Sequence, residues 1–291
     1  LKTLLANPDA DVQLAIANSL WTRQGISFQP EFLQRNRQFY QAKVSELDFG
    51  NPRSVAIINT WVSQSTRGKI DTIIDSIDPN DVMFLINAIY FKGNWSRKFD
   101  PQQTSLQPKK HPMMAQGGEY RYYQTSQFQA VRLPYGTKQR VSLYVFLPQS
   151  SSSLADFQKN LTAENWEQWM AQFRQRQGSI QIPRFKLDYD VQLKRALSQL
   201  GMAEAFSSRA NFSGLSSVPT KIDEVKHKTF VEVNEAGTEA AAVTSIGIRA
   251  TSARPVEEPF RMVVDRPFFC AIRDDQTGTV LFMGAIANPK I

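Results

Sequence analysis

The chain has 291 residues, of which 42% are hydrophobic and 21% are charged, so it can bury a large core and wholesale disorder is not expected. It has one cysteine, Cys270, which excludes a disulfide within the chain and makes the fold depend on packing. The formal net charge is +7, but there is no run of five like charges and no apolar run of membrane-spanning length, and the first residues do not have the pattern expected of a signal peptide. We therefore expect no nucleic-acid partner and no membrane partner.

The first part of the chain mixes strand and helix patterns without regular alternation. Residues 11–22 have the composition of a buried strand, and residues 43–50 alternate apolar and polar side chains as a half-buried strand does. Residues 29–42 and 51–70 place apolar side chains at helical spacing. The long apolar run at 81–95 predicts a central strand rather than an edge strand.

The second part is richer in strands. Strands are predicted at residues 120–124, 129–136, 141–148 and 179–188, and helices at 150–160 with Ser153 as its cap, at 164–173, and at 191–202 with Gly201 closing it. Residues 267–289 read as two strands joined by a tight turn. The fold class is therefore predicted as α+β with large, mainly antiparallel sheets, in one domain over residues 1–291.

The side chains that enzymes and metal sites need are scarce. There are two histidines, His111 and His227, far apart in the sequence, and none of the common nucleophile, zinc, phosphate-loop or dinucleotide motifs occurs. Metal sites built from histidine and cysteine are effectively excluded, and no cofactor is predicted. Because the many carboxylates show no spacing that singles out an acid–base pair, a hydrolase is not supported.

A long connection between two apolar strands, residues 230–260, is the most informative segment. Loops beyond about 12–15 residues are uncommon in compact domains and are usually functional or disordered. Taken alone, the alanine-rich part could form a short helix capped by Asn234 or Thr238. Alternatively it is a latent strand that pivots at Gly237, since one of its faces carries small uncharged side chains throughout: Thr238, Ala240, Ala242 and Thr244.

Motifs along the whole chain resemble those of the serpins, in the family's order. They are the segments "FLINAIYFKGNWSRKF" (84–99), "HPMM" (111–114), "VRLPY" (131–135), "LSQLGM" (197–202), "NFSGLS" (211–216), "VNEAGTEAAAVT" (233–244) and the C-terminal hairpin. The resemblance implies the serpin fold, with a large central sheet, further sheets, surrounding helices and an exposed reactive-centre loop at about residues 237–256. It also implies that the family's N-terminal helical part precedes Leu1 and is absent from this sequence.

The function that the resemblance implies is suicide-substrate inhibition of a serine protease. The protease cleaves the loop, an acyl-enzyme forms, and the severed segment inserts into the central sheet. Counting from Glu235 as in inhibitory serpins places the cut between Thr251 and Ser252, while Arg249 and Arg254 are alternatives that suit a trypsin-like enzyme. An elastase-like target fits Thr251, and a cysteine protease is not excluded.

Further residues match family positions one by one. The hinge comprises Glu235, Gly237, Thr238, Glu239, Ala240, Ala241, Ala242, Val243 and Thr244. By resemblance, Asn87 and His227 lie where the sheet must open and form a hydrogen bond, and Trp95 lies where insertion begins. For the histidine, a satisfied core side chain is an equally valid interpretation, and for the tryptophan an ordinary aromatic core.

Two other functions remain open. A non-inhibitory serpin-fold binding protein keeps the fold without trapping a protease, although the small side chains at 240–242 argue against it. A plain protease substrate is cleaved in the loop without forming a complex. We expect a monomer, and the compartment stays open, with an extracellular or cell-envelope location preferred.

Overall fold

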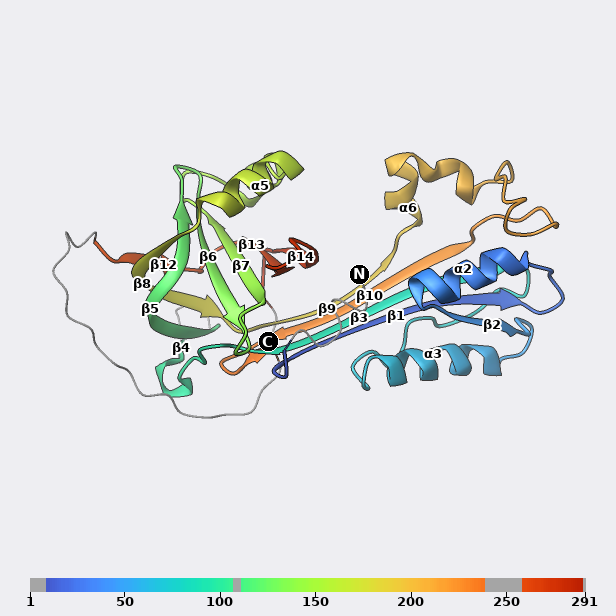
Figure 1. Cartoon of the computed structure of the whole chain (residues 1–291), viewed down its shortest axis with the longest axis horizontal. Helices are drawn as coiled ribbons and strands as arrows, with labels where there is room; N and C mark the ends of the chain where they lie inside the picture. Colours follow the sequence, from blue (N-terminus) through green and yellow to red (C-terminus); the bar gives the residue numbers. More distant parts are fainter. Residues whose placement is uncertain (1–8, 107–110, 239–257, 290–291) are drawn as a thin grey trace. The chain divides into compact units, whose positions relative to one another are not determined.

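The computed structural model describes residues 9–106, 111–238 and 258–289 (Figure 1). The chain divides into two compact units. The first contains the described residues of Leu14–Phe91 and Leu187–Val231. The second contains those of Asn7–Gln13, Lys92–Lys186 and Glu232–Ile291. Each unit is described below by itself.

A mixed sheet forms the centre of the first unit. Its strand order is β2 (Lys43–Leu47), β1 (Val12–Arg23), β3 (Met83–Asn94), β10 (Glu224–Val233) and β9 (Phe185–Gln192). The central pair, β3 and β10, runs parallel, with seven residue pairs from Phe84–Glu224 to Tyr90–Phe230. The pairing of β1 with β2 is also parallel.

Helices cover both faces of this sheet because the strand side chains alternate. Trp21 and Phe84 belong to one core cluster with Ile58 and Val62 of α3 (Arg53–Ser65). Their chain neighbours Leu20 and Met83 belong to a second cluster, against which Phe32 and Leu33 of α2 (Pro30–Tyr40) pack. Figure 1 shows the two helices on opposite sides of the sheet. The remaining helical turns of this unit are α6 (Lys194–Leu197), η2 (Ser198–Met202) and η3 (Ala203–Phe206).

The second unit is built on a larger, mainly antiparallel sheet. Its strand order is β12 (Phe260–Val263), β8 (Arg174–Pro183), β5 (Pro112–Gln124), β6 (Phe128–Tyr135), β7 (Val141–Pro148), β13 (Phe268–Asp274) and β14 (Val280–Ile286), and β4 (Ser105–Leu106) pairs with β5. Its aromatic core packs under α4 (Leu154–Lys159) and α5 (Ala163–Gln172). A short turn of helix, η1 (Pro101–Gln103), precedes β4. Cys270 is buried in β13, and burial raises the pKa of its thiol to about 12, which suits the predicted core role.

Most of the sequence-based elements agree with the structure in type and differ at their ends. The single strand expected at 179–188 is wrong, because the chain passes at Arg184 from β8 of one sheet to β9 of the other. The Ser153 hydroxyl accepts from the Asp156 amide at 3.1 Å, which confirms the predicted cap. Gly201 adopts a φ of 99° at the end of the predicted helix, as its closing role requires. The predicted helix at 191–202 begins later than expected, because β9 continues to Gln192. Strand β12 is too short, at four residues, to give a periodic signal, and the sequence patterns do not predict it as a separate element.

Candidate functional site

The connection after β10 turns back at once and joins β3. β10 ends at Val233, and the short strand β11 (Gly237–Thr238) pairs antiparallel with Asn94 and Gly93 of β3. Gly237 has a φ of +143°, and a Cβ there would overlap the Gly93 carbonyl oxygen and approach Asn94 Cα to 2.5 Å. Only glycine fits at this point. The sequence-predicted pivot therefore lies where the backbone needs it, and the chain leaves it as an antiparallel neighbour of β3.

Glu235 anchors the turn between β10 and β11. The residue is 7% exposed, and one carboxylate oxygen accepts from Arg184 Nε at 2.7 Å and from the Thr104 hydroxyl. Its backbone oxygen accepts from the Phe99 amide at 2.9 Å. Burial raises the pKa of Glu235, but the hydrogen bonds from Arg184 and Thr104 outweigh it, so the pKa lies below its ordinary value. The carboxylate stays charged at neutral pH and holds the hinge turn in place.

Trp95 also holds this turn in place. The indole is 4% exposed and stacks on Tyr135 with ring centroids 4.4 Å apart. Its Nε1 donates to the Asn234 carbonyl oxygen at 2.8 Å, and its backbone amide donates to the Ala236 carbonyl oxygen at 2.9 Å. Two hydrogen bonds from one residue thus fix the start of the predicted hinge.

Asn87 and His227 meet in the first unit, on the two parallel strands. They are register partners in β3 and β10, and His227 Nδ1 lies 2.7 Å from Asn87 Oδ1, which confirms the predicted hydrogen bond. Asn87 Nδ2 donates to Asn18 Oδ1 at 2.7 Å, and His227 Nε2 lies 2.9 Å from the Thr229 hydroxyl. Burial lowers the pKa of His227, while Asp190 opposes that shift. The imidazole is therefore held neutral within a chain of four polar side chains that crosses β1, β3 and β10.

Several predicted residues lie outside the described part of the chain. They are the hinge residues Glu239, Ala240, Ala241, Ala242, Val243 and Thr244, and the reactive-bond candidates Arg249, Thr251, Ser252 and Arg254. The structure therefore brings together Glu235, Gly237 and Trp95 in the second unit, and Asn87 with His227 in the first.

Sequence reasoning missed the partners that hold these residues. The basic residues around Arg184 have the pattern of a solvated rim, and nothing in the sequence draws attention to Thr104 or Asn18. Arg184 and Glu235 are far apart in the sequence, so no spacing rule links them. The one available signal is a lone arginine between Pro183 and Phe185, two residues that are buried here.

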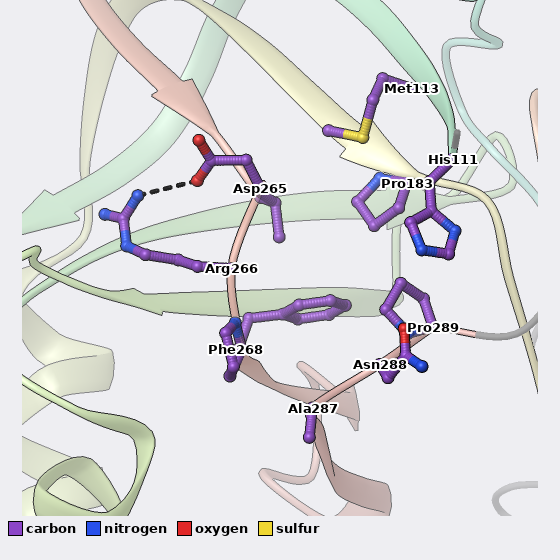
Figure 2. Close-up of a pocket in the computed structure, with 11 residues that line it drawn as sticks. His111, Met113, Pro183, Asp265, Arg266, Phe268, Ala287, Asn288 and Pro289 are labelled. Atoms are coloured by element: carbon purple, nitrogen blue, oxygen red, sulfur yellow. Dashed lines mark hydrogen bonds and ion pairs between the residues drawn. The ribbon is translucent and has the colours of Figure 1, made fainter. Parts of the chain in front are cut away.

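The strand that follows the predicted loop, β12, ends beside a cavity of about 260 Å³ (Figure 2). Met113, Pro183 and Phe268 give it an apolar wall. Asp265 and Arg266 pair with each other at 3.0 Å. His111 also lines the cavity, and its buried Nδ1 has no hydrogen-bond partner among the described residues.

The described residues contain neither a group of metal ligands nor a helix that could cross a membrane. There, no three histidine, cysteine, aspartate or glutamate side chains are grouped so that they could hold a metal ion. No described helix has the length and apolar character needed to cross a bilayer.

Comparisons with known proteins agree on one family. The family model described as serpin (serine protease inhibitor) matches residues 1–289. Human neuroserpin is 34% identical over 297 residues, which cover 95% of this chain and 72% of neuroserpin. The crystal structure of tengpin, a thermophilic serpin in the native state, superposes with a TM-score of 0.87 at 30% identity, covering 99% of this chain and 76% of tengpin. Human thyroxine-binding globulin complexed with thyroxine gives 0.86 at 25% identity, covering 99% and 78%. The chain therefore belongs to the serpin family and has the serpin fold.

Proposed function

We propose that this serpin inhibits a serine protease as a suicide substrate. The protease would cut the segment after β11, most simply at Thr251–Ser252, and remain bound as an acyl-enzyme. The severed segment would then insert into the sheet of β3 and β10 as a new strand. Arg249 and Arg254 are alternative cleavage positions, and they would direct the inhibitor to a trypsin-like enzyme rather than an elastase-like one.

The observation that carries this proposal is the pairing of β3. Over Phe84–Tyr90 its partner is the parallel strand β10, and at Gly93–Asn94 its partner is β11, which runs antiparallel. A strand that continued β11 along β3 would be antiparallel to β3 and β10 alike, and antiparallel pairing is slightly the more stable per residue. Serpin loop insertion is itself a known example of such strand addition, in which main-chain hydrogen bonds provide the stabilisation.

The segment from Thr238 to Thr251 is long enough for the proposed insertion. From Thr238 to Thr251 there are 14 residues, which span about 45 Å as a strand. That is on the order of a small domain's diameter, enough to carry a bound protease a long way. The intact state would then be held by a kinetic barrier and not by being the most stable arrangement.

The decisive experiment is a search for the trapped complex. The protein is incubated with a panel of elastase-like and trypsin-like serine proteases and one papain-like cysteine protease, and the products are separated in denaturing detergent. We expect a covalent complex with at least one serine protease, and mass spectrometry of the released peptide identifies the cut. Cleavage within 239–257 without any complex would overturn inhibition in favour of a plain substrate.

A second function within the same fold is a non-inhibitory binding protein. Human thyroxine-binding globulin, which shares this fold, was crystallised with thyroxine. The same incubation distinguishes this function, because a carrier of that kind gives no covalent complex with any protease. A comparison of melting temperatures before and after loop cleavage adds a second criterion: insertion raises Tm strongly, and a loop that stays outside the sheet leaves it unchanged.

A further inference from the structure

A polar cavity of about 390 Å³ in the second unit has no role in the mechanism above. One wall comes from the segment 95–99 that follows β3, including Trp95 and Phe99. Further lining residues come from β5 and β6, including Arg121 and Arg132, and Arg97 belongs to the segment itself. Three arginines therefore line one cavity, whereas Glu119 is the single acid among the described residues that line it.

Two of these arginines lie next to each other on neighbouring strands. Arg121 and Arg132 are direct register partners across β5 and β6, and like charges directly opposite each other destabilise a sheet. Arg132 is held by Asp275 at 2.9 Å and by the Gln139 carbonyl oxygen at 2.8 Å. Arg121 is exposed, and its guanidinium makes no hydrogen bond or ion pair with any described residue. A bound anion would neutralise the charge that the pairing leaves.

Arg97 is fixed in place before any ligand arrives. Its Nη2 donates to the Gly117 carbonyl oxygen, and its guanidinium occupies the space that a Cβ on Gly118 would need. The side chain thus lies across the strand only because residue 118 is a glycine. A guanidinium that is already ordered loses less freedom on binding, which favours affinity.

Apolar side chains complete the cavity and narrow the class of ligand. Phe99, Leu133 and Pro134 line it beside the arginines. A bare inorganic ion would leave this wall unused. We propose that the cavity binds a small organic anion with an apolar body, such as an aryl sulfonate or an aryl carboxylate, whose charged group contacts Arg97 and Arg121.

The same segment connects the cavity to the hinge turn. The amides of Trp95 and Phe99 donate to the carbonyl oxygens of Ala236 and Glu235, each at 2.9 Å. From the side of β5, the buried Gln116 donates through Nε2 to the Lys98 carbonyl oxygen at 2.7 Å. A ligand that packs on the 95–99 segment stabilises the conformation of that segment to which it binds. Binding therefore also stabilises the hydrogen bonds between this segment and the hinge turn.

The opposite side of the cavity leads to the strand that follows the predicted loop. Tyr120 lines the cavity and also contacts Phe260, the first residue of β12, edge to face with ring centroids 6.0 Å apart. Residues that line the cavity therefore contact the described residues at both ends of the predicted reactive-centre loop.

Binding is tested by titration calorimetry on the intact, uncleaved chain with toluene-4-sulfonate. We expect saturable one-to-one binding, at least tenfold weaker for the neutral toluene-4-sulfonamide and for inorganic sulfate. Arg121→Gln is expected to weaken binding at least tenfold, whereas Arg261→Gln, an exposed arginine on β12 outside the cavity, changes it less than twofold. Equal binding by the sulfonamide, equal effects of the two variants, or no saturable binding would overturn the proposal.

The link to the hinge has its own measurement. Toluene-4-sulfonate is expected to slow hydrogen exchange of the Trp95 and Phe99 amides at least threefold in the wild type and not in Arg121→Gln. Unchanged exchange at saturating ligand would overturn the link. Neither measurement uses a protease, so both stand or fall independently of the inhibitory function.

Discussion

Removing the guanidinium of Arg184 is expected to loosen the hinge turn by a measurable free energy. In Arg184→Gln, Glu235 keeps the Thr104 hydroxyl but loses its charged donor, whose Nη2 also lies 2.5 Å from the carboxylate oxygen. Breaking a fully buried ion pair costs about 3–5 kcal/mol. The Arg184 side chain is 37% exposed while that of Glu235 is 9% exposed, so water replaces part of the interaction. We therefore expect a loss of about 2 kcal/mol in the free energy of unfolding.

The assay is urea unfolding at pH 7, with Arg261→Gln on the exposed edge strand as the matched control, expected to change the free energy by less than about 0.5 kcal/mol. A double-mutant cycle with Glu235→Gln isolates the pair, and a coupling energy of about 1–2 kcal/mol is expected.

The effect of Arg184→Gln must also depend on pH in a defined direction. The pKa of Glu235 is lowered in the folded state, so its contribution is fully present above the carboxyl's unfolded pKa of about 4.5 and is lost as pH falls through the lower folded value. The difference between wild type and Arg184→Gln therefore shrinks as the pH is taken from 7 towards 3. A difference that is the same at both ends of this range would refute the assignment of the stabilisation to the charged pair.

Four further outcomes are expected. Thr238→Arg should convert the proposed inhibitor into a substrate, because cleavage needs only an exposed loop, whereas trapping needs an inserted strand without a buried charge. The control is Thr72→Arg at an exposed position, and an undiminished yield of covalent complex from Thr238→Arg would contradict the prediction. Gly237→Ala should lower Tm by several degrees, since its Cβ meets backbone atoms of β3; an unchanged Tm refutes it. Because the pKa of His227 is lowered in the folded state, its contribution to the free energy of unfolding is full above about pH 6.5 and is lost as the pH falls below that value. His227→Gln should therefore make the free energy of unfolding depend less on pH between about pH 7 and 5. His111→Phe should stabilise the fold by about 1 kcal/mol in thermal unfolding, because it removes a buried nitrogen that has no hydrogen-bond partner in the described part of the chain; a destabilised variant refutes that reason.

The hinge residues could be predicted from the sequence, but the residues that hold them in place could not. Gly237 could be predicted because small side chains and a pivot form a local pattern, and the hydrogen bond of Asn87 with His227 followed from matching two motifs to one family. Arg184, Thr104 and Asn18 could not be found in this way. Each acts on a residue that lies far away in the sequence, and their side-chain types are common on any surface.

Strand ends show the same limit. β9 extends past the predicted boundary to Gln192, whose side-chain oxygen accepts from the Val225 amide of β10 at 3.1 Å. A contact between distant strands thus decides where the strand ends and the helix begins, and local propensity does not contain that information.

The seven-residue parallel ladder between β3 and β10 sets a timescale for the proposed inhibitor. In the proposed mechanism, hydrolysis of the acyl bond and separation of β3 from β10 would compete once the loop is cut, and the faster reaction would determine whether the protease is released or trapped. Each residue of β3 from Phe84 to Tyr90 would therefore affect the rate at which the two strands separate. Substitutions that tighten the ladder would make a more stable protein and a poorer trap.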